Sequence, residues 1–151
     1  ENQVYFHSNC CESIRLCMNN VMTNRLIICG GGVLLTPHYL KSINLKKSSV
    51  LFQSPQEANE FDIGIIDNEG KLESLSLAIS DKCWTEIMYL TGQKLIQSFY
   101  NLVSNPEYKN KFLFEAINDW PNRREVVTQH NEYYPIVKIN NVKTLRRIND
   151  E

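Results

Sequence analysis

The chain has 151 residues, an apolar share of 42% and a formal net charge of −1 at pH 7, from 16 basic and 17 acidic side chains. This length fits one domain with a packed core and room for an appendage. The balanced charge argues against nonspecific nucleic-acid binding and against electrostatic attachment to a membrane, because both need a broad basic surface. We also expect no membrane span or secretory signal, since no apolar run approaches the roughly 20 residues of a spanning helix.

The cysteines point to a reduced environment. Their number is odd and no two of them are spaced C-x-x-C, which argues against both a disulfide framework and a zinc site. We therefore expect no metal and no cofactor, and free thiols in a cytosolic or nuclear protein. Cys29 and Cys83 have apolar neighbours and are predicted to be packed rather than reactive. The full set is Cys10, Cys11, Cys17, Cys29 and Cys83.

The first part of the chain alternates strand and helix signals. β-Branched and aromatic residues predict a strand over 3–7. Apolar residues at helical spacing predict a helix over 12–28. The glycines that follow are expected to end this helix, since glycine tolerates the left-handed backbone of a helix terminus. They lack the spacing and the Lys-Ser/Thr of a phosphate-binding loop. These glycines are Gly30, Gly31 and Gly32.

Short strands are predicted next, over 33–35 and 50–53, joined by a polar, lysine-bearing connection over 37–47. An Asp-Asn-Glu-Gly turn signal occupies 67–70. Residues 71–77 then form either a short helix or a strand paired with residues 61–66.

The strongest amphipathic signal begins at Ser80 and Asp81, either of which can cap a helix. Trp84 follows early, as a large apolar anchor that we assign to the core rather than to a binding surface. The spacing predicts one helix that continues to about Val103. Its shared face holds Trp84, Ile87, Met88, Thr91 and Leu95.

The C-terminal third begins with Asn105-Pro106, where the proline suits the first turn of a helix. Trp120-Pro121 is expected to end that helix, because the residue before a proline avoids the helical region. A strand is predicted over 134–139, followed by a basic tail. Trp120 either folds this segment back onto the domain or contacts a partner.

This order of elements, with the glycines after the first helix and the run Ile79-Ser80-Asp81-Lys82-Cys83-Trp84, resembles the BRCT domain over roughly residues 3–103. Strands separated by helices also favour a parallel sheet. The resemblance implies an α/β fold over residues 1–103, with a small, largely parallel four-stranded sheet flanked by helices. Residues 104–151 are expected to form a C-terminal extension with an extra helix and an extended segment.

In phosphopeptide-binding BRCT domains a Ser or Thr after the first strand and a Lys at the start of the second helix hold the phosphate. Ser8 and Lys71 stand at the corresponding positions, and Asn9 replaces the glycine that donates a backbone N–H. A hydroxyl and an ammonium would make charge-assisted bonds to a phosphate. A turn serine and a solvated lysine are the plain alternative. A secondary anion surface is Lys41, Lys46 and Lys47.

The sequence contains no recognisable catalytic motif. The histidines His7, His38 and His130 accompany no nucleophile elbow. Carboxylates around the 67–70 turn suggest a nuclease metal site, but the Glu-x-Lys expected on the following strand is missing. We therefore predict no catalytic residue and no enzyme activity. The carboxylates weighed here are Asp62, Asp67, Glu69 and Glu73.

These observations predict a non-catalytic protein–protein interaction module of a nuclear chromatin, telomere or DNA-damage protein. Its partner would be a protein or phosphoprotein segment. Nucleic acid would be contacted only through the basic tail of Lys138, Lys143, Arg146 and Arg147. The alternative is a pleckstrin-homology-like docking domain for protein or lipid, with antiparallel strands over 50–53, 61–67 and 71–79. A helix over 12–28 favours the first interpretation, and a strand pair there favours the second.

Overall fold

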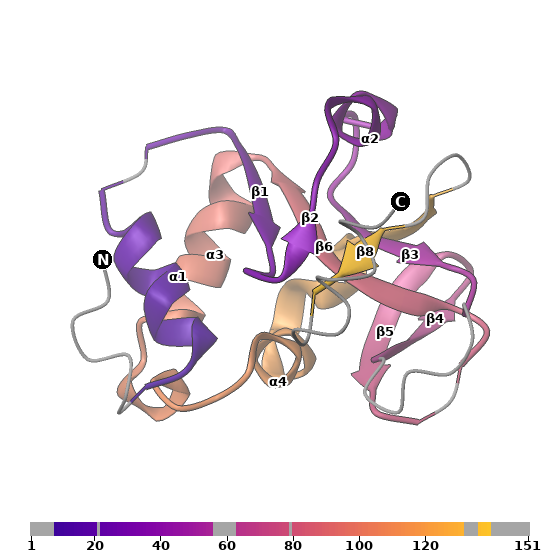
Figure 1. Cartoon of the computed structure of the whole chain (residues 1–151). Helices are drawn as coiled ribbons and strands as arrows, with labels where there is room; N and C mark the ends of the chain where they lie inside the picture. Colours follow the sequence, from indigo (N-terminus) through magenta and orange to yellow (C-terminus); the bar gives the residue numbers. More distant parts are fainter. Residues whose placement is uncertain (1–7, 21, 56–62, 79, 132–135, 140–151) are drawn as a thin grey trace.

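A six-stranded mixed sheet organises the chain, in the order β1-β6-β3-β7-β5-β4 (Figure 1). It is seen in a computed structural model that describes residues 8–20, 22–55, 63–78, 80–131 and 136–139. Only β3 and β7 pair in parallel, and the remaining pairs in this sheet are antiparallel. The strands are β1 Arg25–Cys29, β3 Ser49–Gln53, β4 Gly64–Asn68, β5 Lys71–Ser76, β6 Cys83–Thr91 and β7 Val127–His130.

Five of these strands curl into a barrel-like core. The closure comes from the pairing of Gly64 with Cys83, which joins β4 back to β6. Gly64 is needed there, because a Cβ on it would lie 2.8 Å from the Ala78 carbonyl oxygen. The β4–β5 hairpin turns at Glu69 and Gly70, which take φ values of 50° and 76°. The predicted 67–70 turn is confirmed, and residues 71–76 form the strand alternative rather than the helix.

Helices cover one face of the sheet and enclose the larger core (Figure 1). They are α1 Cys10–Met18, α3 Gln93–Val103 and α4 Leu113–Asp119, with short 3-10 turns at Pro106–Tyr108 and Pro121–Glu125. Trp120 is fully buried and meets Phe99 edge-on, with ring centroids 5.1 Å apart. The C-terminal segment therefore folds back onto the domain. The division of the chain at residue 103 stays a prediction.

A smaller core lies on the opposite face. Helix α2 (Pro37–Ser42) and the two-stranded ribbon of β2 (Val33–Leu34) and β8 (Val137–Lys138) supply its cover. Strand side chains alternate between faces, so β6 sends one set of residues to each core. The smaller core consists of Tyr39, Ile43, Leu51, Ile87, Tyr89 and Ile136.

The predicted fold class is wrong, and the opening helix is the main reason. Residues 83–91 form a strand, and the helix begins only at Gln93. Ser80 caps no helix; its hydroxyl donates to the Ile65 carbonyl at 3.1 Å. Strand β6 is buried on both faces, so its apolar residues are nearly continuous and also fit a helical spacing. Trp84 is 2% exposed, which confirms its place in the core.

The helix predicted over 12–28 is also too long. Helix α1 ends at Met18, and Arg25–Cys29 form β1, paired with β6. Gly30, Gly31 and Gly32 therefore follow a strand and do not stop a helix.

The predictions over 33–35 and 50–53 are confirmed by β2 and β3, and the helix end at Trp120-Pro121 is confirmed as well. The strand predicted over 134–139 is represented by β8. The strand over 3–7 lies outside the described residues. In the part of the chain that the structure describes, no helix has the length and apolarity to cross a bilayer.

Candidate functional site

A bulge in the middle of β6 sets the geometry of the candidate site. Val50 of β3 faces Met88 and Phe52 faces Trp84, so one residue of β3 lies opposite three residues of β6. Glu86 is the middle one of these three residues of β6. Its φ of 63° is a left-handed backbone conformation, which is costly for a residue with a Cβ. Non-glycine residues held in such conformations concentrate at functional sites.

Two buried hydrogen bonds hold the bulge in place. The indole N–H of Trp84 donates to the Ile87 carbonyl at 3.1 Å. The Thr85 hydroxyl donates to the Leu51 carbonyl at 2.9 Å. Because these bonds satisfy polar groups inside the sheet, the left-handed residue is held firmly. The Glu86 side chain is 36% exposed.

The glycine turn after β1 closes around this carboxylate. The Gly30 N–H donates to the Glu86 carbonyl at 3.0 Å, and a Cβ on Gly30 would collide with the Glu86 carboxylate. A Cβ on Gly32 would lie 2.9 Å from the Ile139 carbonyl oxygen, next to the bond from the Ile139 N–H to Gly32 at 2.7 Å. Gly31 faces open space. The two outer glycines thus allow Glu86 and β8 to approach the turn closely.

Lys138 completes the arrangement from the far end of the chain. It lies on β8 opposite Val33, its side chain is 9% exposed, and its Nζ is 3.6 Å from Oε1 of Glu86. The nearly buried ammonium is paired with a carboxylate, as buried charges in proteins usually are. We call Gly30, Gly31, Gly32, Glu86 and Lys138 the Glu86–Lys138 site.

The chemistry available at the Glu86–Lys138 site is electrostatic. The Lys138 ammonium can neutralise a phosphate oxygen, and the backbone of the glycine turn faces open space at Gly31. Glu86 can hold the ammonium in place. The site lies just beyond the carboxyl end of β1.

A second polar cluster closes one end of the barrel. Lys82 Nζ lies 2.6 Å from Asp67, whose pKa is lowered chiefly by this hydrogen bond against the effect of burial. The Thr128 hydroxyl donates to Asp67 at 3.3 Å. Lys82 also lies 5.1 Å from the Phe52 ring centroid, and Phe52 stacks on His130. These groups bond one another across neighbouring strands, which indicates a structural role.

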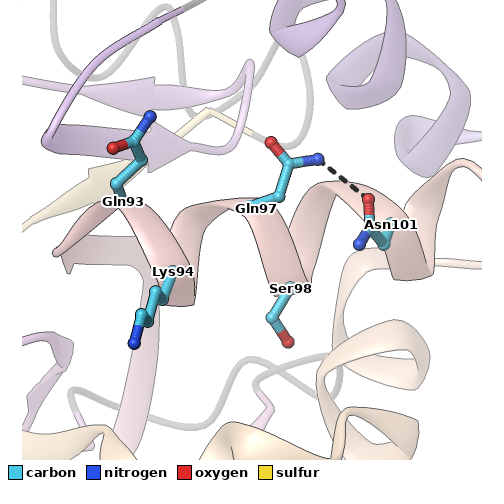
Figure 2. Close-up of a pocket in the computed structure, with 5 residues that line it drawn as sticks. All are labelled: Gln93, Lys94, Gln97, Ser98 and Asn101. Carbon is cyan, nitrogen blue, oxygen red and sulfur yellow. Dashed lines mark hydrogen bonds between the residues drawn. The ribbon is translucent and has the colours of Figure 1, made fainter.

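A polar groove of about 420 Å³ runs along α3 (Figure 2). Gln93, Gln97 and Asn101 point to one side of the helix in this view, and Lys94 and Ser98 to the other. Ser98 is engaged in packing, since it accepts from the Trp120 indole at 2.9 Å and donates to Asn122 at 2.7 Å. All five lining residues come from one helix, so few polar groups converge on a ligand here.

The predicted phosphate ligands do not come together. Asn9 caps α1, with its side chain accepting the Cys10 N–H at 2.8 Å, and Ser8 precedes it. Lys71 opens β5 and is exposed. Figure 1 places α1 and β5 on opposite sides of the molecule. Their role in phosphate binding stays a prediction, as does that of the exposed Lys41, Lys46 and Lys47 on and after α2.

The other sequence predictions fall as follows. Cys29 is exposed, so its assignment to the core is wrong, whereas Cys83 is buried as predicted. His7 and Asp62 lie outside the described residues. Among the described residues, no group of three or more His, Cys, Asp or Glu side chains could hold a metal ion. The sequence prediction missed Glu86, whose only signal was a lone charge inside the apolar run of β6.

No known protein-family model matches the chain. No curated protein matches it by sequence either. Solved structures do match. The CTP:phosphocholine cytidylyltransferase from Streptococcus pneumoniae aligns with a TM-score of 0.72 and 12% identity, over 99% of this chain and 66% of that one.

Two further solved structures also have a similar backbone fold. The inositol-1-phosphate CTP transferase from T. maritima aligns with a TM-score of 0.68 and 14% identity, over 87% of this chain and 56% of that one. A protein named as a putative glucose-1-phosphate thymidylyltransferase from Bacillus anthracis, solved in complex with a sucrose, has a TM-score of 0.65 and 18% identity, over 93% of this chain and 59% of that one. The chain thus spans less than two thirds of the length of each of these proteins.

The chain therefore has the fold of nucleotidyltransferases, and the expected BRCT fold is wrong. The predicted non-catalytic interaction module in chromatin, telomere or DNA-damage biology is wrong too, because it rested on the BRCT resemblance, which these structures do not share. The pleckstrin-homology-like alternative is not supported either, although its antiparallel β4–β5 pair exists. The nuclear location stays a prediction.

Proposed function

We propose that the chain acts in nucleotidyl transfer, from a nucleoside triphosphate to a phosphorylated acceptor. The observation that carries this proposal is the backbone similarity to transferases of this kind over 87% to 99% of the chain. The acceptors in their names, phosphocholine, inositol 1-phosphate and glucose 1-phosphate, share an anionic phosphate on a small polar body. That shared chemistry defines the acceptor class we propose here.

The reaction needs no protein nucleophile. An oxygen of the acceptor phosphate, already anionic at neutral pH, attacks the α-phosphorus of the triphosphate. The bond from that phosphorus to the bridging oxygen breaks, and pyrophosphate leaves. Positioning and charge neutralisation are then the main tasks of the protein. For this reason the absence of a nucleophile elbow or a catalytic histidine, on which we predicted no activity, does not argue against this chemistry.

The Glu86–Lys138 site has the groups for these tasks. The nearly buried Lys138 ammonium would bind a phosphate oxygen and stabilise the charge that builds up during transfer. Glu86 would position that ammonium, and the ligand would approach the backbone at Gly31, where an added Cβ meets open space.

The test is pyrophosphate release by the purified protein, with each of the four common nucleoside triphosphates as its Mg²⁺ salt and each of the three acceptors. We expect release with at least one pair. Lys138→Ala is expected to lower kcat/KM by about 10²- to 10³-fold, the usual effect of removing a group that stabilises transition-state charge. The matched control is Lys109→Ala, which removes an exposed lysine next to α1 and is expected to change kcat/KM by less than about twofold.

Two results would overturn the proposal. One is no release, and no binding of any triphosphate or acceptor by calorimetry, across the whole panel. The other is equal loss of activity in Lys138→Ala and Lys109→Ala, which would remove the Glu86–Lys138 site from the mechanism.

A further inference from the structure

The side-chain amide of Gln53 is bonded to both backbone polar groups of one residue, Ile136. Its Oε1 accepts the Ile136 N–H at 2.7 Å, and its Nε2 donates to the Ile136 carbonyl at 3.2 Å. Gln53 is the last residue of β3, and Ile136 directly precedes β8, the strand that carries Lys138. The amide thus exchanges both bonds with this residue, as a paired residue of an antiparallel strand would. We call these two hydrogen bonds the Gln53 clamp.

Strand β8 has little backbone pairing of its own. It pairs with the two residues of β2, and beyond its end the Ile139 N–H donates to the Gly32 carbonyl. A two-stranded ribbon is only marginally stable in isolation. The Gln53 clamp holds the other end of this segment and ties it to β3, a strand of the six-stranded sheet. The position of β8 relative to that sheet therefore depends on the clamp.

The ion pair of the Glu86–Lys138 site joins the same two parts of the fold. Glu86 belongs to β6 of the main sheet, whereas Lys138 belongs to the β2–β8 ribbon. The 3.6 Å between Lys138 Nζ and Glu86 Oε1 is longer than a hydrogen bond, so this pair alone does not fix the ammonium. A shift of β8 against β6 would change the separation directly.

We propose that Gln53 is a positioning residue for Lys138, holding β8 so that the ammonium stays at the Glu86–Lys138 site. That the ammonium there serves phosphate chemistry rests on the proposed nucleotidyl transfer, whereas its placement by Gln53 does not. A misplacement of about 1 Å at a reacting centre can cost about 10²-fold in rate. The amide suits this task because it offers a donor and an acceptor together, whereas an ionised carboxylate of the same size has no donor for the Ile136 carbonyl.

The helical face provides a matched control, because it contains a clamp of the same kind. The Asn118 side chain on α4 accepts the Leu75 N–H at 2.7 Å and donates to the Leu75 carbonyl at 2.8 Å. It joins α4 to β5 and does not touch β8. Asn118→Ala therefore removes the same two kinds of hydrogen bond as Gln53→Ala, away from the Glu86–Lys138 site.

The first test measures Lys138 itself, by competitive acetylation of the native protein with isotope-coded acetic anhydride, read by mass spectrometry for every lysine. In the parent protein the nearly buried Lys138 is expected to react more slowly than the exposed Lys109. Gln53→Ala is expected to raise the Lys138 rate by at least about fivefold, the factor that corresponds to one lost hydrogen bond. Gln53→Glu, which keeps the size of the side chain, is expected to act in the same direction, and Asn118→Ala to leave the Lys138 rate unchanged.

Thermal unfolding shows which variants are folded, and Gln53→Glu decides the question if Gln53→Ala does not fold. An unchanged Lys138 rate in the folded Gln53 variants overturns the proposal, whether or not the protein transfers nucleotides. An equal rise in Asn118→Ala overturns it as well, because the effect would then be a general loosening of the fold.

The second test measures pyrophosphate release in a double-mutant cycle. Gln53→Ala is expected to lower kcat/KM by about 10- to 10²-fold in the parent protein. In the Lys138→Ala background the same change is expected to cost less than about twofold, because the ammonium that Gln53 positions is already absent. Equal losses in the two backgrounds overturn the proposal. No release from any substrate pair counts against the proposed function instead, and the acetylation rates then decide the role of Gln53.

Discussion

The two faces of the sheet differ in how they are built. The helical face is covered by α1, α3 and α4. The indole N–H groups of both its tryptophans donate hydrogen bonds within the protein. On the opposite face, the described residues contribute the short α2 and the β2–β8 ribbon over six buried residues. The left-handed Glu86, the glycine turn and the Lys138 ion pair all belong to this thinner side. We infer that the helical face supplies most of the stability, and that the other face holds the strain and the charge needed for binding.

The largest expected effect comes from Trp84, which links the two faces. Trp84→Ala is expected to cost about 3–5 kcal/mol of unfolding free energy, as for other large aromatic residues removed from a core. Trp84→Phe keeps most of the packing but leaves the Ile87 carbonyl without its donor, at a cost of about 1–3 kcal/mol. Urea denaturation measures both. If Trp84→Phe costs as much as Trp84→Ala, the hydrogen bond and not the packing dominates.

The same residue shows what the sequence could and could not predict. Its burial was predictable, because a tryptophan among regularly spaced apolar residues is core in either a helix or a strand. Its secondary structure was not, since a strand buried on both faces gives the same apolar run as one side of a helix. The β-branched Thr85, Ile87 and Thr91 were the local signal for the strand.

The candidate site was less predictable, because long-range pairing creates it. The three glycines were predicted to end a helix, which is wrong, and their neighbour Lys138 belongs to a two-residue strand near the other end of the chain. No local propensity indicates that β2 and β8 pair. The left-handed backbone of Glu86 depends in turn on the bulge between β3 and β6, which tertiary hydrogen bonds hold.

The glycine turn allows a sharper test within the thinner face. Gly32→Ala places a Cβ against the Ile139 carbonyl and is expected to cost about 1–3 kcal/mol, because backbone must shift to accommodate it. The control is Gly31→Ala, where the added methyl meets open space and the change is expected to stay within about 1 kcal/mol. Thermal unfolding of the two variants measures the difference. Equal costs would contradict the close approach of β8 to the turn.

Glu86 is expected to separate stability from activity. Glu86→Gly removes the penalty of a left-handed backbone and is expected to raise the unfolding free energy by about 1 kcal/mol. It also removes the carboxylate beside Lys138, so nucleotidyl transfer is expected to fall. Glu86→Gln keeps the strain and loses the charge, so its stability is expected to stay near that of the parent protein. A fall in stability in Glu86→Gly would show that the Lys138 ion pair outweighs the strain.

The smallest expected effect concerns Asp67 in the barrel, where the pair with Lys82 joins neighbouring strands. The pKa of Asp67 is lowered in the folded protein, so the stabilisation is fully present above the unfolded-state value of about 3.9 and is lost as the pH falls through the lower folded value. Asp67→Asn is therefore expected to cost about 1 kcal/mol at pH 7, and the difference from the parent protein is expected to shrink between about pH 5 and pH 2. Urea denaturation across this range measures it, with the exposed Asp81→Asn as the control. A difference that is independent of pH would mean that Asp67 contributes through its shape and neutral hydrogen bonds.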